Sequence, residues 1–389
     1  MASSPAEQPP EQPWFTVDGN RLRLLDTGPR RLEALIALID GAERSLRVLF
    51  YIYTDDHAGR RVRDAMVAAQ TRGVQVSLIV DGFGSEVGGD DDFFRPLTDA
   101  GGELCRFLPR FGRRYLLRNH QKLALADEAR VITGGFNVED DYFGTPAEDA
   151  WRDLGVEIDG PAAGRIARYF DDLSAWARDD KARIRTLRRA LKRASETSGG
   201  VRWLLGGPTR RLSPWAQALR ADIRGAAQVD MIAAYFAPGP GLLRRIDRAR
   251  RVRLITAAKS DNNATIAAAR FTYAGLLRQG AKIFEFQPTK LHTKLYVIDD
   301  IVHIGSANFD MRSLFINLEI MVRIDDAAFA AHVRGYFEGE MAKSEAITAE
   351  VNRRRSGWWT RIRQFAAYLL IAVLDYNVSR RLNFGIDGR

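Results

Sequence analysis

Residues 120–127 read His-Gln-Lys-Leu-Ala-Leu-Ala-Asp, and residues 292–299 repeat the pattern as His-Thr-Lys-Leu-Tyr-Val-Ile-Asp. The chain has five histidines and eight lysines, and two of each fall in this arrangement, 172 residues apart. Residues 121–126 and 295–298 are mostly apolar and predict buried strands, on which residues two apart share a face. We therefore expect each histidine beside the lysine of its own copy, and each aspartate on the opposite face at the strand end. The residues are His120, Lys122 and Asp127 in the first copy, and His292, Lys294 and Asp299 in the second.

An imidazole beside an ammonium suits phosphoryl transfer, because the ring nitrogen attacks phosphorus while lysine stabilises the charge on the non-bridging oxygens. Two such pairs facing each other supply a nucleophile on one side and a general acid on the other. A Gly-(Gly/Ser)-x-Asn stretch follows each copy, at residues 134–137 and 305–308. Its small residues allow close backbone approach, and Asn137 and Asn308 are neutral donors for the same oxygens. The duplication predicts one active site built from two halves.

The composition describes a basic globular chain that is long enough for two domains. Its 389 residues carry a net charge of +9 with a pI of about 9.8, which favours a polyanionic partner: an anionic membrane surface or nucleic acid. The single cysteine, Cys105, excludes an internal disulfide and a cysteine-based zinc site. The histidines form neither a His-x3-His nor a His-Glu-x2-His pair, so no catalytic metal and no cofactor are expected.

Helical and strand-like segments follow one another in the same order in both parts of the chain, each order ending in a His-x-Lys strand. This predicts an α/β protein with two similar α-β-α sandwich halves packed around a pseudo-twofold axis. We expect the boundaries to give a disordered tail at 1–14, the first half at 15–180, a basic helix and linker at 181–200, the second half at 201–345 and a basic, aromatic C-terminal segment at 346–389.

The duplicated His-x-Lys-x4-Asp pattern resembles that of the phospholipase D superfamily, and the resemblance covers roughly residues 15–345. Within the superfamily the chain is similar to the bacterial cardiolipin synthases. In the first half the similarity lies in Tyr51-Ile52-Tyr53, Asp81-Gly82-Phe83-Gly84-Ser85 and Trp151-Arg152-Asp153. In the second half it lies in Tyr235-Phe236-Ala237-Pro238, Lys259-Ser260-Asp261 and residues 305–313, which lead to Asn317 and Glu319.

The resemblance implies a double displacement in which two phosphatidylglycerol molecules become cardiolipin and glycerol. His120 is expected to attack phosphorus and form a phosphatidyl-histidine intermediate, with His292 as acid and base, although the near symmetry of the halves leaves the reverse assignment open. The superfamily also implies a carboxylate that orients each histidine, and Asp153 and Glu319 match that role. The implied catalytic set is His120, Lys122, Asp127, His292, Lys294 and Asp299, with Asn137 and Asn308 binding phosphate. A phospholipase D-type hydrolase or transphosphatidylase that releases phosphatidic acid, and a nuclease, share this core motif.

The C-terminal segment contains Trp358-Trp359, flanking arginines and ten apolar residues at 365–374. Ten residues are too few to span a bilayer, and the chain has no apolar run of 18. The pattern predicts a segment lying in the headgroup region, with docking on the protein's own core as the alternative. The helix at 181–193 is either a solvated linker or a second membrane contact. We expect a peripheral enzyme on the cytoplasmic side of an anionic phosphatidylglycerol membrane, without nucleic acid.

Overall fold

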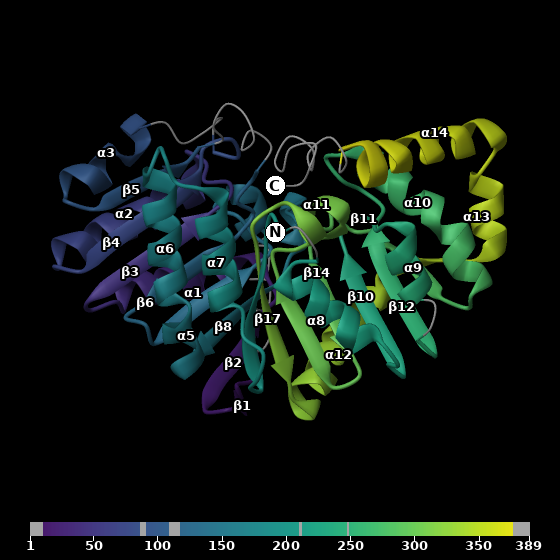
Figure 1. Ribbon diagram of the computed structural model, residues 1–389, viewed down its shortest axis with the longest axis horizontal. Coiled ribbons are helices and arrows are strands. Elements are labelled where there is room, and N and C mark those ends of the chain that lie inside the picture. Colours follow the sequence, from purple (N-terminus) through teal and green to yellow (C-terminus); the bar gives the residue numbers. More distant parts are fainter. Residues whose placement is uncertain (1–10, 86–90, 109–116, 210–211, 247–248, 376–389) are drawn as a thin grey trace, which may run out of the picture.

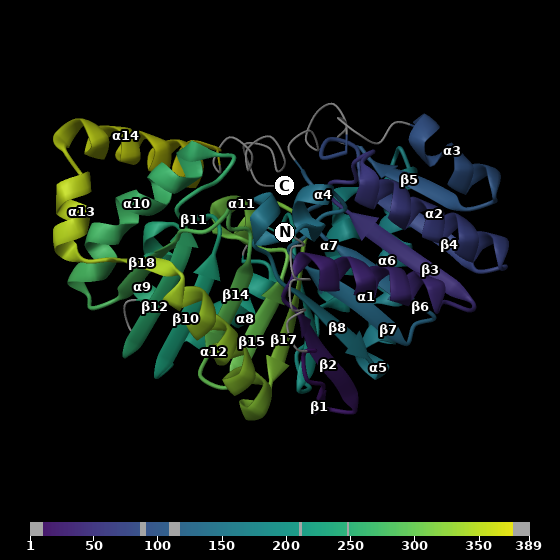
Figure 2. The same cartoon turned by 180° about the vertical axis from the view of Figure 1, so that it is seen from behind.

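The computed structural model describes residues 11–85, 91–108, 117–209, 212–246 and 249–375. The described chain folds into two eight-stranded sheets that stand side by side, with helices on their outer faces and between them (Figures 1 and 2). A two-stranded sheet lies at the upper edge of the second half, close to the line where the two halves meet.

The first sheet has the strand order β1-β2-β8-β7-β6-β3-β4-β5, in which β3, β4 and β5 are parallel and the other pairs are antiparallel. Its strands are β1 (Phe15–Val17), β2 (Asn20–Leu25), β3 (Ser45–Phe50), β4 (Gln75–Asp81), β5 (Glu103–Phe107), β6 (Leu123–Ala126), β7 (Arg130–Gly134) and β8 (Gly155–Asp159). The helices of this half are α1 (Gly28–Asp40), α2 (His57–Thr71), α3 (Asp91–Asp99), α4 (Asp140–Phe143), the short η1 (Pro146–Glu148), α5 (Pro161–Arg165), α6 (Ala167–Arg178) and α7 (Ile184–Ala194).

The second sheet has the order β18-β13-β12-β10-β14-β15-β17-β9, again with three parallel strands, β10, β12 and β13, and antiparallel neighbours. Its strands are β9 (Val201–Gly206), β10 (Gln228–Ala233), β12 (Arg251–Ala257), β13 (Lys282–Phe286), β14 (Lys294–Ile298), β15 (Ile301–Gly305), β17 (Glu319–Asp325) and β18 (Ser344–Ile347), while β11 (Phe236–Ala237) and β16 (Phe309–Asp310) form the two-stranded sheet. The helices are α8 (Pro214–Ile223), α9 (Pro240–Ile246), α10 (Asn263–Arg278), α11 (Met311–Phe315), α12 (Ala327–Ala342), α13 (Ala349–Arg355), α14 (Trp358–Tyr368) and η2 (Leu369–Asp375).

Seven strands of each sheet have the same connectivity. Read from one edge, β2-β8-β7-β6-β3-β4-β5 in the first sheet corresponds to β9-β17-β15-β14-β10-β12-β13 in the second. The eighth strand differs, because β1 extends the β2 edge of the first sheet and β18 extends the β13 edge of the second. The prediction of two similar α/β halves is therefore confirmed.

Sequence features explain where the helices start and how they pack. The α1 helix begins after Thr27, whose hydroxyl accepts the backbone N–H of Arg30, and α2 begins after Asp56, whose carboxylate accepts that of Gly59 at 2.8 Å. The apolar faces of α1 to α4 cover one face of the first sheet, and those of α8 to α11 cover the outer face of the second. The outer helix layers of the two halves are therefore similar, as are the strand orders of the two sheets.

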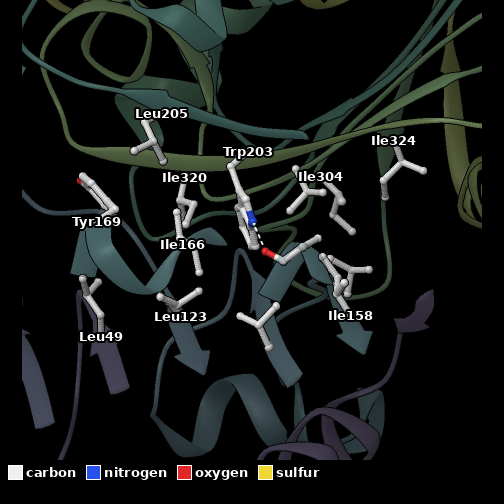
Figure 3. Packing of buried hydrophobic residues seen from close by; sticks show 14 of the residues in the cluster. Leu49, Leu123, Ile158, Ile166, Tyr169, Trp203, Leu205, Ile304, Ile320 and Ile324 are labelled. Carbon is white, nitrogen blue, oxygen red and sulfur yellow. Dashed lines mark hydrogen bonds between the residues drawn. The ribbon is translucent and has the colours of Figure 1, made fainter. Parts of the chain in front are cut away.

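The largest core lies between the two sheets and joins them. Strands β7, β8, β15 and β17 contribute buried valines and isoleucines from both halves, while α5, α6, α7 and α12 close the sides. Trp203 on β9 is fully buried at its centre and donates its indole N–H to the carbonyl oxygen of Ala162 at 2.8 Å (Figure 3). Burial of apolar surface contributes about 25 cal/mol per Å², so separating the halves would expose this shared core to water at a large cost in free energy. The core therefore fixes the position of one half relative to the other.

The N-terminal boundary differs from the expectation, and part of the C-terminal segment packs on the second half. The disordered tail was expected to reach residue 14, but Trp14 lies under the guanidinium groups of Arg21 and Arg23, and the Gln12 side chain is 2.9 Å from His332; residues 1–10 lie outside the described part. The helix α7 buries Leu187 and Leu191 in the shared core, which favours the linker interpretation. Residues 346–375 pack partly on the second half, and 376–389 lie outside the described residues.

Candidate active site

The two histidines stand where β6 and β14 begin, and each is held there by the backbone of the other half. The N–H of His120 donates to the carbonyl oxygen of Leu318 at 2.9 Å, and the N–H of His292 donates to that of Arg152 at 2.8 Å. These bonds belong to two isolated parallel bridges between the halves. The bridge explains why β6 starts at Leu123 rather than at residue 121, since the preceding residues are paired across the halves instead of within their own sheet.

The orienting carboxylates are exchanged between the halves. Asp153 of the first half places Oδ2 2.6 Å from Nδ1 of His292, and Glu319 of the second half places Oε1 3.4 Å from Nδ1 of His120. Each carboxylate directly follows the residue whose carbonyl binds the histidine N–H, so one short segment fixes both backbone and ring. Asp153 is one carbon shorter than Glu319 but makes the closer contact.

The glycine and serine of the Gly-(Gly/Ser)-x-Asn stretches make room for these carboxylates. A Cβ on Gly135 would lie 2.4 Å from a carboxylate oxygen of Asp153, so a side chain at residue 135 would displace it. At the matching place in the second half, the hydroxyl of Ser306 donates to Oε2 of Glu319 at 2.5 Å and accepts the N–H of Ile320. The small residues were expected to allow close backbone approach, and the groups that approach them are the carboxylates of Asp153 and Glu319.

The two lysines are buried in the site, and the nearby charges of Glu319 and Asp153 act on both of them. Lys122 donates to the carbonyl oxygen of His120 at 2.7 Å, and Lys294 donates to that of His292. Within the described part of the chain, neither ammonium forms an ion pair. Burial lowers the pKa of Lys122 to about 8 and that of Lys294 to about 7. Two cations in a region shielded from water create a site for an anion.

The electrostatics also define the state of His292. Burial, together with the charge of Lys294, lowers the pKa of His292 to about 4, so the ring is neutral near pH 7. Burial alone would raise the pKa of Asp153, but the charges of Lys294 and His292 outweigh it and hold the pKa below the ordinary value. Nδ1 of His292 also lies 2.6 Å from Nζ of Lys294, and one ring nitrogen cannot both donate to the carboxylate and accept from the lysine. We assign the proton on Nδ1 to the Asp153 contact, which leaves Nε2 with its lone pair facing the site.

The two asparagines lie next to the same site. The Oδ1 of Asn137 accepts the backbone N–H of Ile52 at 3.2 Å, and its amide group hydrogen-bonds the hydroxyl of Tyr142, which leaves one amide N–H for another acceptor. Asn308 is buried, and its Oδ1 has no hydrogen-bond partner among the described residues. Both asparagines therefore retain hydrogen-bonding capacity where the two halves meet.

The aspartates of the repeated motif lie at the far ends of their strands. Asp127 accepts the backbone N–H groups of Glu43, Arg44 and Ser45, and Asp299 accepts those of Ala227 and Gln228. Both have a left-handed backbone, with φ of 55° and 48°. Asp127 therefore links the turn after β6 to the start of β3, and Asp299 links the turn after β14 to the start of β10.

Several aromatic and polar residues in the site have no signal in the histidine-lysine spacing. The ring centroid of Tyr51 lies 4.3 Å from that of His120. The ring centroids of Tyr142 and Trp151 lie 5.2 and 5.4 Å from that of His292, both in T-shaped arrangements. The Nδ2 of Asn317 is 3.3 Å from Nδ1 of His120. Three of these residues belong to the segments that suggested the family resemblance, which is the only sequence signal that could have found them.

The site is braced by a buried ion pair between the halves. The guanidinium of Arg152 binds both carboxylate oxygens of Glu340 on α12, at 2.8 and 2.7 Å, and donates to the carbonyl oxygen of Asp26. Arg31, which is fully buried, donates to the carbonyl oxygens of Asp153 and Tyr142. Arg152 and Arg31 therefore hold the segment that carries Asp153 from both sides.

Comparison with known proteins places these features in a family. The chain matches the family described as cardiolipin synthase, phospholipase D-like domain, over residues 35–174 and 219–341, and each matched segment contains one copy of the motif. A cardiolipin synthase A from Pseudomonas fluorescens is 30% identical over 352 residues, covering 86% of this chain and 71% of that protein. A cardiolipin synthase 1 from Bacillus anthracis is 28% identical over 359 residues, covering 87% and 70%. The solved phosphatidylserine synthase of Haemophilus influenzae shares the fold, with a TM-score of 0.71 at 12% identity over 95% of this chain and 97% of that one.

Proposed function

The chain belongs to the cardiolipin synthase family with phospholipase D-like domains and is a phosphatidyltransferase of that superfamily, and we propose that it joins two phosphatidylglycerol molecules into cardiolipin. The observation that carries the proposal is a pair of buried ammonium groups that form no ion pair among the described residues, beside two histidines that each face a carboxylate. This arrangement binds one phosphodiester anion and offers a ring nitrogen on either side of its phosphorus.

The first step breaks the bond between phosphorus and the headgroup glycerol oxygen. Nε2 of His120 attacks phosphorus and forms a phosphorus–nitrogen bond, while His292 donates a proton to the leaving glycerol oxygen. In the second step the glycerol hydroxyl of another phosphatidylglycerol attacks the phosphatidyl-histidine. His292 accepts the hydroxyl proton, His120 leaves, and cardiolipin forms.

The remaining groups serve the charge that develops on the phosphoryl oxygens. Lys122 and Lys294 each keep N–H donors free for these oxygens, and Asn137 and Asn308 add neutral donors. Glu319 and Asp153 keep Nδ1 of each histidine protonated, so Nε2 is the reacting atom. Asp127 and Asp299 act on the framework and not on the substrate.

The two histidines are not equivalent, and this bears on their roles. His292 is neutral in the free site, so it can act as an acid only after it gains a proton. The bound phosphodiester supplies a negative charge beside the two lysines whose field lowers the pKa of His292, which raises that pKa when substrate is present. His120 has the more exposed side chain, 23% against 12%, as suits the atom that meets the substrate first.

The setting we propose is the surface of an anionic phospholipid membrane, reached from the cytoplasmic side as a peripheral protein. Among the described residues, none of the helices is both long and apolar enough to cross a bilayer. The net charge of +9 favours association with anionic lipid.

The test is thin-layer chromatography of lipids after incubating the purified protein with phosphatidylglycerol vesicles. Cardiolipin with an equal amount of glycerol is the expected product pair; phosphatidic acid alone would make the protein a hydrolase, and no lipid product would refute the proposal. His120→Ala and His292→Ala should each lose at least about 1,000-fold in turnover because each supplies an indispensable group. With His292→Asn, mass spectrometry of quenched protein should find the phosphatidyl group on His120; a group on His292 in the His120→Asn protein would reverse the roles.

A further inference from the structure

Large apolar side chains are exposed along one edge of the molecule, around the candidate active site. In the described residues the exposed large hydrophobic side chains are Phe83, Leu108, Phe271, Trp358, Trp359, Ile362, Phe365 and Leu370. Six of them lie on α10, α14 and η2, and α14 runs along the upper edge of the second half (Figures 1 and 2). We call the residues 358–370 and Phe271 the α14 surface.

The α14 surface is attached to the wall of the active site. The hydroxyl of Tyr368 donates to the carbonyl oxygen of Pro238 at 2.8 Å, directly after β11. Strand β11 pairs with β16, which directly follows Asn308. Tyr235, just before β11, lies with its ring 6.3 Å from that of His292. The helix therefore stands beside the His292 side of the site at a fixed position.

The other two exposed residues mark the His120 side. The guanidinium of Arg118 lies 4.0 Å from the ring of Phe83, and Arg118 is two residues before His120. Leu108 reaches the backbone of Gly82, where an added Cβ would lie 2.3 Å from its side chain. Phe83 lies two residues after the end of β4, and Leu108 directly follows β5, so exposed apolar groups lie on both the His120 side and the His292 side of the site.

The α14 surface divides between an inner and an outer face. Gln364 and Tyr368 are buried against the protein, and Tyr368 and Phe365 contact Phe271 on α10. Trp358 and Trp359 remain 63% and 64% exposed although their rings are stacked on each other. The docking interpretation thus holds for one face of the segment, and the other face is uncovered.

The charge around the α14 surface selects the partner. Residues 351–374 contain five arginines and no acidic residue. Arg353, Arg361 and Arg363 are exposed and form no ion pair within the described part of the chain. Tryptophan beside arginine on a helix that lies flat is the composition of an interfacial segment.

We propose that the α14 surface docks on an anionic phospholipid bilayer and sets the active-site entrance against the headgroups, with Phe83 and Leu108 as the second contact. The choice of a bilayer as occupant rests on the proposed function, since a substrate in the membrane must reach His120 and His292 without leaving it. The tryptophans enter the headgroup region, and the arginines bind lipid phosphates.

The proposal is tested by flotation of the full-length protein with vesicles of phosphatidylglycerol, at low and high salt. Trp358→Ser/Trp359→Ser should weaken binding at least tenfold at both salt concentrations, because burial of apolar groups is not screened. Arg361→Glu/Arg363→Glu should weaken it about tenfold at low salt and far less at high salt. The matched control is Arg185→Glu/Arg189→Glu on α7, which removes the same charge from exposed positions and should change binding less than threefold.

Three results would overturn the proposal. One is unchanged vesicle binding by the tryptophan variant with a thermal midpoint like that of the wild type. Another is an equal loss in the α7 control, which would make binding a matter of net charge. The third is a wild-type dimer that the tryptophan variant converts to monomer with vesicle binding unchanged, which would make a second copy the occupant. Cardiolipin formation by the wild-type protein is measured on the same samples, so failure of docking and failure of the proposed reaction are separate readings.

Discussion

Replacement of Lys294 by methionine should make the protein more stable while abolishing its activity. The ammonium is buried without an ion pair in the described part of the chain, and methionine fills a similar volume without a charge. Lowering the pKa of this lysine from 10.5 to about 7 corresponds to about 5 kcal/mol of penalty on the charged form, at 1.36 kcal/mol per pH unit.

The expected net gain is smaller than that penalty. The pKa shift already includes the attraction between Lys294 and Asp153, but Lys294→Met also removes the hydrogen bond to the carbonyl oxygen of His292, on the order of 1 kcal/mol, and its different shape costs up to about 1.5 kcal/mol. We expect a gain of about 1–3 kcal/mol at pH 7. For a chain of this size that is a rise of about 1–4 °C in the thermal midpoint, from about 2.1 cal/mol/K of unfolding entropy per residue.

The pH dependence of the stability difference distinguishes a charge effect from a packing effect, because a packing effect does not change with pH. Between pH 7 and pH 10.5 the unfolded chain keeps the proton on Lys294 and the folded chain does not, so wild-type stability rises with pH over this window. The advantage of Lys294→Met should therefore be present at pH 7 and below and be lost or reversed near pH 10, because the wild type gains about 1.36 kcal/mol per pH unit above its folded pKa of about 7. Scanning calorimetry at pH 6.5, 8 and 10 measures it.

The control is Lys192→Met on α7, where the lysine is exposed and the change should stay within about 0.5 kcal/mol at every pH. A loss of stability in Lys294→Met at pH 7, or a gain that does not shrink with rising pH, would refute the account of a buried, unneutralised cation. Cardiolipin formation by the same variant should fall at least about 1,000-fold.

Three further changes probe other parts of the site. Asp153→Asn should reduce turnover at least about 100-fold with little loss of stability, because His292 loses the acceptor that fixes its tautomer; near-normal steady-state rates would argue against the exchanged pairing. Arg152→Ala should cost about 3 kcal/mol of unfolding free energy by leaving the buried Glu340 with Lys343 as its remaining ion-pair partner, whereas Arg152→Met/Glu340→Leu should recover most of it in calorimetry. The ratio kcat/KM should fall as the pH rises above about 7 to 8, since Lys294 and Lys122 lose the charge that binds phosphate, and EDTA should leave the rate unchanged; a rate lost with EDTA and restored by Mg²⁺ would contradict the proposed lysine role.

The sequence predicted the repeated elements well because the pattern was local. Apolar runs, caps and the His-x-Lys spacing are read within about ten residues, and β6, β14 and the helices around them follow from them. The fold class could be predicted because the same order appeared twice. Strand starts were less accurate, since residues 118–120 pair across the halves and such pairing leaves no mark in the local sequence.

The exchange of Asp153 and Glu319 was beyond reach for a related reason. Both residues could be named from the family resemblance, but spacing along the chain says nothing about which histidine each one meets 139 or 199 residues away. The prediction for the C-terminal segment was incomplete, because an apolar run indicates burial but does not indicate which surface covers it. Phe271 on α10 supplies part of the answer, and the uncovered tryptophans supply the rest.

The reciprocal pairing also constrains how such a chain could have arisen. Neither half contains a histidine together with its own carboxylate, so a protein made of one repeat could complete the site only by pairing with a second copy of itself. Fusion of two copies after gene duplication would then preserve a site that already existed between subunits. It would also free each copy to diverge, as the shorter Asp153 opposite Glu319 and the glycine at 135 opposite Ser306 already record.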